Sequence, residues 1–258
     1  MTASDEWLVD MHVKVLDDEV VRRAKASGLD ALVYAPHFTR LPEIEATASA
    51  YSDDELRVFP AREVFTGTWR NRQHVLALGL SDPVPDFITL DGAMTEFERQ
   101  DATVLVPHPE FLNVSLDEAA IQRYREEIAA IETYNPKVTD RSNRRSRTIA
   151  ARQDLPPFGS SYAHLPGTVG AAWTAFDGEA LGDEVTESSL TAALEAGDVS
   201  RTGHRNGLSH YGRRLAERAH LGWENTWAKV DRLFLSGTEP THPDHIAYDG
   251  AFDDVAVY

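Results

Sequence analysis

The 258-residue sequence contains no cysteine, which excludes disulfide bonds, thiolate metal ligands and cysteine nucleophiles. Any metal ion must therefore be held by histidine, aspartate or glutamate side chains. The chain also lacks a run of about 18 apolar residues, so we expect no membrane-spanning helix. Its first ten residues, MTASDEWLVD, are acidic and lack the basic and apolar regions of a signal peptide, and we expect a cytoplasmic protein.

Lysine is scarce as well. The chain has 42 aspartate and glutamate residues and a formal net charge of −17, and its lysines are Lys14, Lys25, Lys137 and Lys229. This composition resembles that of cytosolic proteins from extreme halophiles, in which salt screens the repulsion across an acidic surface. The alternative is an ordinary acidic protein of a mesophile. A basic face for nucleic acid is lacking in either case, so we expect no general nucleic-acid binding.

The sequence has no GxGxxG or Walker-type phosphate loop, which leaves a nucleotide-binding doubly wound sheet without support. Apolar, strand-like runs instead alternate with helical segments as far as about residue 176. A strand at 7–13, a helix at 17–26 and a strand at 30–38 are typical of an α/β fold. About seven such strands favour a barrel. Ser115 and Glu118 fit a capping box at the start of a further helix.

Histidines lie at the edges of the apolar runs, and they are His12, His37, His74, His108 and His164. The stretch 57–80 reads as two strands joined by a polar turn, the first ending near Glu63 and the second opening with His74. Because barrel folds build their sites at strand ends, we expect these side chains to converge with Glu63 at the centre. One histidine at a strand end is more often structural, but the ordered set indicates a site.

The order of these motifs resembles the PHP family, named for polymerase and histidinol phosphatase domains. The family's opening Asp-x-His-x-His is DMHVK here (10–14), and its Thr-Asp-His is APH (35–37). PAREVF and QHVLALG follow with the glutamate and the next histidine, then His-Pro (108–109) and Glu-x-x-Asn (132–135). SYAH (161–164) stands for the final Ser-Asp-Ala-His, and ALEAG (193–197) resembles a helix of family members with a C-terminal extension. The likeness covers residues 7 to about 200.

The resemblance implies a distorted (β/α)7 barrel of the TIM type, which we place at residues 1–180. A C-terminal helical extension packed on the barrel would follow at 181–258. Within it we expect a long, broken helical region over 208–235, with Trp223 and Trp227 as core anchors. The family also implies up to three divalent ions at the mouth of the barrel and, usually, hydrolysis of phosphoesters.

Carried over by position, the resemblance gives ligand sets for two metal ions. The first set is Glu63, His74 and His108. The second is His37, His164 and a carboxylate from the first loop, where Asp17 and Asp18 are both candidates. Sets of histidine and carboxylate suit zinc, manganese or iron, and we expect two ions or fewer.

The ligand set of a third ion is incomplete. It would use His12 and Glu63, but Lys14 replaces its second histidine and Tyr162 replaces its aspartate. A protonated lysine cannot ligate a metal ion and repels it. We therefore expect the Lys14 ammonium group to lie near Glu63, in the place of the lost ion. The candidate catalytic residues are Glu63, His108 and Lys14.

These residues and the resemblance predict a metal-dependent phosphoesterase acting on a small anionic phosphorylated metabolite or a nucleotide. Arg62, Arg72 and Arg144 are candidates for binding the substrate, because a guanidinium group matches phosphate in bidentate fashion. Strand alternation, however, points Arg62 away from the Glu63 side chain. The altered motifs leave two alternatives, a degenerate PHP domain used for binding or scaffolding and an amide or ester hydrolase on the same barrel.

The acidic composition makes a prediction about salt. The thermal unfolding midpoint should rise between dilute buffer and molar KCl, because salt screens the repulsion among surface carboxylates. Circular dichroism at increasing KCl concentrations measures this midpoint. A midpoint that does not move with KCl would remove the halophile interpretation.

Overall fold

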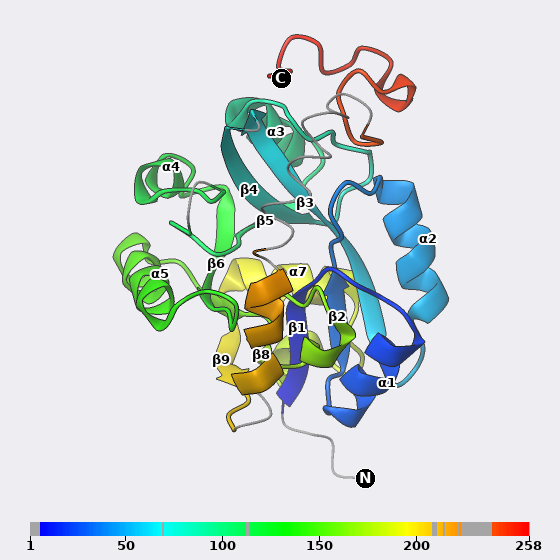
Figure 1. The fold of residues 1–258 in the computed structure, drawn as a ribbon, viewed down its shortest axis with the longest axis vertical. Helices are drawn as coiled ribbons and strands as arrows, with labels where there is room; N and C mark the ends of the chain where they lie inside the picture. Colours follow the sequence, from blue (N-terminus) through cyan, green and yellow to red (C-terminus); the bar gives the residue numbers. More distant parts are fainter. Residues whose placement is uncertain are drawn as a thin grey trace.

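The computed structural model describes residues 6–68, 70–111, 114–207, 211–213, 215–220, 222 and 239–257. Its strands form one mixed sheet in the order β7-β6-β5-β4-β3-β2-β1-β8-β9, with helices around it (Figure 1). No helix within these ranges is both long enough and apolar enough to cross a bilayer. Most of the helical region expected at 208–235, including Trp223 and Trp227, lies outside the described residues.

The strands are β1 (Glu6–Val13), β2 (Ala31–Tyr34), β3 (Arg57–Thr68), β4 (Asn71–Leu78), β5 (Thr103–Val106), β6 (Ile128–Tyr134), β7 (Pro157–Gly159), β8 (Ala172–Asp177) and β9 (Val199–His204). The helices are α1 (Asp18–Ala26), α2 (Leu41–Tyr51), α3 (Leu90–Arg99), α4 (Glu118–Arg123), α5 (Asp140–Gln153), α6 (Gly178–Leu181) and α7 (Glu187–Ala196). Short 3-10 turns occur at Pro166–Thr168 and Ile246–Tyr248.

The sheet curves until it almost closes. The chain just beyond β7 returns to β1 through a parallel bridge between Val13 and Ala163, where the Lys14 amide donates to the Ala163 carbonyl at 2.9 Å. The predicted α/β, TIM-like barrel is therefore confirmed. The expected number of seven strands is wrong, because the described residues contain nine. One strand beyond the expected set is β9, which pairs antiparallel with β8.

The β3–β4 hairpin carries the middle of the site. The first strand does not end near Glu63, as predicted, but continues to Thr68, and β4 begins at Asn71, before His74. The two strands are antiparallel, with Phe65 opposite His74. Because side chains alternate along a strand, Glu63, Phe65 and His74 share the face that looks into the barrel.

One buried apolar cluster joins the strands to α7. It includes Met11, Leu76 and Leu105 from the strands and Leu190 and Leu194 from the helix. The helix thus covers part of the barrel interior, although it follows residue 180 in the sequence. The sheet also contains strands from before and after residue 180, where we expected the domain boundary. The division into two domains stays a prediction.

Arg62 is part of the scaffold in this structure. It is fully buried, its Nη2 lies 3.1 Å from Asp86 Oδ1, and its Nη1 donates to the Thr39 carbonyl at 3.0 Å. Asp86 also accepts hydrogen bonds from the Phe65 amide at 2.8 Å and from the Thr241 hydroxyl. Asp86 thus links β3 to Thr241 of the C-terminal tail, on the face of β3 opposite Glu63. This placement does not support the predicted contact of Arg62 with the substrate.

The ion pair gives a prediction for stability. Asp86→Ala leaves the Arg62 guanidinium buried without its carboxylate, which should lower the free energy of unfolding by about 3–5 kcal/mol. Urea denaturation in high salt measures the change. Asp82→Ala is the matched control, because it removes a carboxylate from an exposed pair with Arg99 and should change little. Equal unfolding midpoints for the two variants would contradict this role of Asp86.

Candidate metal centre

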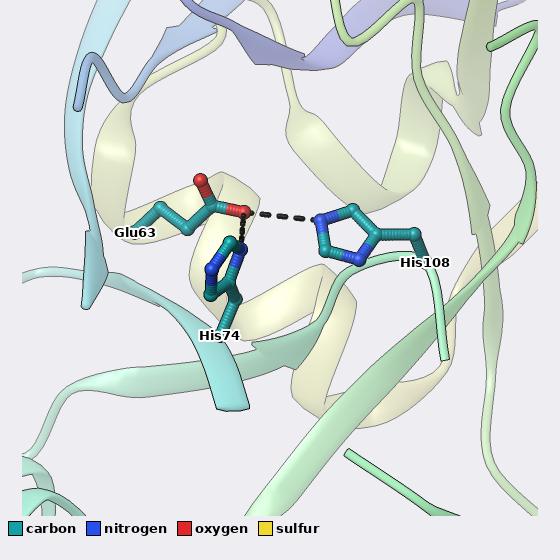
Figure 2. A group of neighbouring side chains, drawn as sticks. All are labelled: Glu63, His74 and His108. Carbon is teal, nitrogen blue, oxygen red and sulfur yellow. Dashed lines mark hydrogen bonds and ion pairs between the residues drawn. The ribbon is translucent and has the colours of Figure 1, made fainter. Parts of the chain in front are cut away.

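Glu63 lies at the centre of a buried group of ionisable side chains. Its Oε1 is 3.2 Å from His108 Nε2 and 3.3 Å from His74 Nδ1 (Figure 2). His12 Nε2 lies 3.8 Å from the same oxygen. Neither His74 nor His12 is aligned for a hydrogen bond with it. The ligand atoms of Glu63, His74 and His108 lie within 4.8 Å of one another. Three side chains from β3, β4 and the loop after β5 thus point at one position.

The tautomer of His108 follows from its neighbours. Its Nδ1 lies 2.8 Å from the hydroxyl oxygen of Ser115, and that hydroxyl donates to the Phe111 carbonyl at 3.1 Å. The Ser115 oxygen therefore accepts a hydrogen bond from Nδ1–H of His108, and in a neutral imidazole this leaves the Nε2 lone pair facing Glu63. Two lone pairs 3.2 Å apart repel each other unless a cation lies between them. The arrangement fits a metal ion at this position.

His74 supports the same interpretation. Both of its ring nitrogens are buried without a hydrogen-bond partner, and its ring stacks on Phe65 with centroids 3.9 Å apart. Burial lowers the pKa of His74 to about 4, against the opposing effect of Glu63. The imidazole is therefore neutral, as a metal ligand must be. A buried carboxylate and two imidazoles suit zinc, manganese or iron.

The second oxygen of Glu63 faces an ammonium group. Lys14 Nζ lies 2.6 Å from Oε2 and also donates to the Ala35 carbonyl, while His37 Nδ1 lies 3.1 Å from Oε2. Burial lowers the pKa of Lys14 to about 8, although Glu63 opposes this shift. Burial would raise the pKa of Glu63, but Lys14 and the histidines hold it well below its usual range. The pair is therefore ionic at neutral pH, and Lys14 lies where the sequence predicted.

Tyr162 fills the space next to His12. Its ring centroid is 4.7 Å from that of His12, 5.1 Å from that of His108 and 4.8 Å from that of His164. Both nitrogens of His12 are buried without a hydrogen-bond partner, in a bulged part of β1. The aromatic ring thus stands where a third metal would need its aspartate.

The second predicted ligand set is only partly assembled. His37 Nε2 and His164 Nε2 approach to 3.3 Å. Asp17, however, is the N-cap of α1, is exposed, and accepts a hydrogen bond from the Val20 amide at 2.8 Å. Asp18 is also exposed, in the first turn of that helix. These placements do not support the predicted first-loop ligand, because an Asp directly before a helix serves as its cap.

A carboxylate that sequence reasoning missed lies beside His164 instead. Glu217, from the C-terminal segment, accepts hydrogen bonds from the His164 amide at 3.1 Å and the Leu165 amide at 2.9 Å. Lys137 forms an ion pair with it at 2.9 Å. No motif surrounds Glu217 in the sequence, so no local signal could have identified it.

A hydrogen-bond chain holds His108 in place. Glu132 accepts from the His108 amide at 2.7 Å and from Asn135 Nδ2 at 3.0 Å. Asn143 on α5 bonds both the amide and the carbonyl of Asn135, each at 3.0 Å. His108 has a φ of +33°, a strained value for a residue with a side chain, and these bonds hold it there.

Three further predictions concern residues near the site. Arg72 is buried with its guanidinium carbon 5.8 Å from the Phe65 ring centroid, and Arg144 is exposed on α5. The capping box of Ser115 is wrong, because Asp117 caps α4 by accepting from the Ala120 amide. Ser115 bonds His108 instead.

Comparisons with known proteins agree with this architecture. A family model described as PHP-associated matches residues 140–199. The crystal structure of PsfC from Pseudomonas syringae PB-5123 is similar over 84% of this chain and 100% of its own, with 20% identity and a TM-score of 0.60, which shows the fold. No curated protein matches the sequence.

Two further solved structures are more distant. One is a protein from Bifidobacterium adolescentis assigned as a metal-dependent phosphoesterase, with 14% identity, coverage of 74% of this chain and 96% of its own, and a TM-score of 0.48. The other is an amidohydrolase from Chromobacterium violaceum, with 13% identity, coverage of 63% and 89%, and a TM-score of 0.49.

The site predicts the effect of removing a ligand. Wild-type protein loaded with zinc or manganese and then dialysed should retain about one ion per chain, and His108→Ala should retain almost none. Elemental analysis of protein purified in high salt without a His-tag measures this. His204→Ala, at an exposed position of β9, is the control and should keep the ion. Equal metal contents for the two variants would exclude His108 as a ligand.

Proposed function

We propose that this chain is a PHP-type, metal-dependent hydrolase acting on a phosphoester of a small anionic metabolite or nucleotide, in line with the PHP-associated match over residues 140–199. The observation that carries the proposal is the buried group of Glu63, His74 and His108, whose ligand atoms face one position. A divalent ion held there would acidify a water molecule and polarise a phosphoryl oxygen.

The remaining residues of the site have separate roles in the proposal. Lys14 keeps Glu63 ionised and places a positive charge on the opposite side of the carboxylate. His37 is the most exposed member of the group, with 16% of its side chain accessible against 6% for His74. We therefore place the approach of the substrate on the side of His37. Burial lowers the pKa of His37 to about 3, so it is neutral there.

The alternative of a non-catalytic scaffold is weaker. Lone pairs that face each other in a dry interior cost about 1–3 kcal/mol each when left unsatisfied. A protein that only binds a partner has no use for such an arrangement at the mouth of its barrel. Hydrolysis of an amide or a neutral ester is also less favoured, because the ammonium groups of Lys14 and Lys137, paired with Glu63 and Glu217, are donors that suit an anionic substrate. Cytoplasmic location and halophilic character stay predictions of the sequence.

The experiment is a substrate panel with manganese- or zinc-loaded protein in molar KCl. We expect hydrolysis of p-nitrophenyl phosphate or bis(p-nitrophenyl) phosphate that disappears with EDTA. Glu63→Gln keeps the shape of the side chain and should reduce the rate by at least about 100-fold, since a ligand is lost. Glu195→Gln, an exposed position on α7, is the control. Cleavage of p-nitrophenyl acetate or an anilide alone would favour the amide or ester hydrolase, and no cleavage by metal-bound protein would favour the scaffold.

A further inference from the structure

A second buried site beside the metal group holds a carboxylate of the chain itself. Glu217 Oε1 accepts from the amides of His164 and Leu165, at 3.1 and 2.9 Å, and from the Thr168 hydroxyl. Its Oε2 lies 2.9 Å from Lys137 Nζ, and the two charged side chains are 2% and 1% exposed. Two amides, a hydroxyl and an ammonium group around one carboxylate make a complete anion-binding site.

This anion site adjoins the candidate metal centre. Lys137 Nζ contacts His164 Nδ1, and the other nitrogen of His164 lies 3.3 Å from His37 Nε2. His37 in turn lies 3.1 Å from Glu63 Oε2. A molecule that bound at Lys137 would therefore extend toward Glu63.

The distribution of lysine supports a role in binding an anion. The chain has four lysines against 42 acidic residues, yet Lys14 and Lys137 are both buried here. Their ammonium nitrogens face the same Tyr162 ring, at 5.6 and 4.7 Å from its centroid. Burying ammonium groups is costly even when they are paired, so stability alone does not account for two of them in one place.

The segment that carries Glu217 is held mainly by polar contacts. Tyr211 and Leu215 are 63% and 53% exposed. Arg218 donates to the carbonyls of residues 137 and 138, at 3.1 and 2.8 Å, next to the Glu217 contact. Figure 1 draws this segment in orange, in front of β1 and β8. The described apolar side chains of 211–220 are exposed, and a segment held by polar contacts opens at a lower free-energy cost than one with a buried apolar face.

We propose that Lys137, Thr168 and the amides of His164 and Leu165 bind the phosphoryl group of the substrate, and that Glu217 occupies this site until the substrate displaces it. The inference rests on the proposed function and names the residues that bind its substrate. His37 contacts both His164 and Glu63, so a phosphoryl group bound at this site would lie beside the side chain where we place the approach of the substrate. Glu217 is thus an internal competitor for the anion.

The test measures the binding of inorganic phosphate to metal-free protein by isothermal titration calorimetry at constant KCl. Glu217→Ala removes the competitor, so phosphate should bind at least about tenfold more tightly than to the wild type. Adding Lys137→Met to Glu217→Ala should reverse the gain. Glu195→Ala makes the same change of charge on the exposed surface of α7 and should bind phosphate as the wild type does.

Glu217→Gln provides a second measurement if the alanine variant does not fold. It keeps the size and one acceptor oxygen but loses the charge, and it should give a smaller gain in phosphate affinity. Folded variants that bind phosphate no more tightly than the wild type would overturn the proposal and make Glu217 a structural anchor. A gain that survives Lys137→Met would overturn it too. The measurement needs neither metal nor turnover. Phosphate binding can therefore be interpreted even if the protein proves not to be a hydrolase.

Discussion

The carboxylate of Glu63 is the charge on which the rest of the site depends. It is fully buried, so its ionised form requires positive charge nearby. One oxygen has the Lys14 ammonium group, and the other faces ring nitrogens of His74 and His108. A single carboxylate thus separates a position filled by the chain itself from a position suited to a metal ion. The antiparallel β3–β4 hairpin makes this possible by bringing Glu63 and His74 to one face.

The same division explains the altered sequence motifs. An ammonium group at Oε2 and an aromatic ring beside His12 stand at the two positions where the third ion of the family would need ligands, and they come from Lys14 and Tyr162. The substitutions act together, because Lys14 also faces the Tyr162 ring. The result is a site in which an ammonium group, paired with Glu63, takes the place of an ion. A fixed ammonium group attracts an anion without depending on metal supply.

The sequence predicted the barrel and the approach of its histidines to Glu63, since apolar periodicity and residue order are local properties. The length of β3 was not predicted. Polar residues near the hairpin turn pair with residues of β4, and this pairing extends the strand to Thr68. Alternation already indicated that Arg62 points away from Glu63, and its pairing with Asp86 is a long-range contact. Glu217 had no local signal, because its donors are mainly backbone amides, which every residue possesses.

Anomalous diffraction from crystals grown with manganese tests the metal position at Glu63 most directly. We expect a single anomalous peak bounded by Glu63 Oε1, His74 Nδ1 and His108 Nε2. Lys14 should remain in contact with the other oxygen of Glu63. A peak between Glu63 Oε2 and His37, with Lys14 displaced, would contradict the division of the carboxylate. The absence of any peak at Glu63 would contradict the metal centre itself.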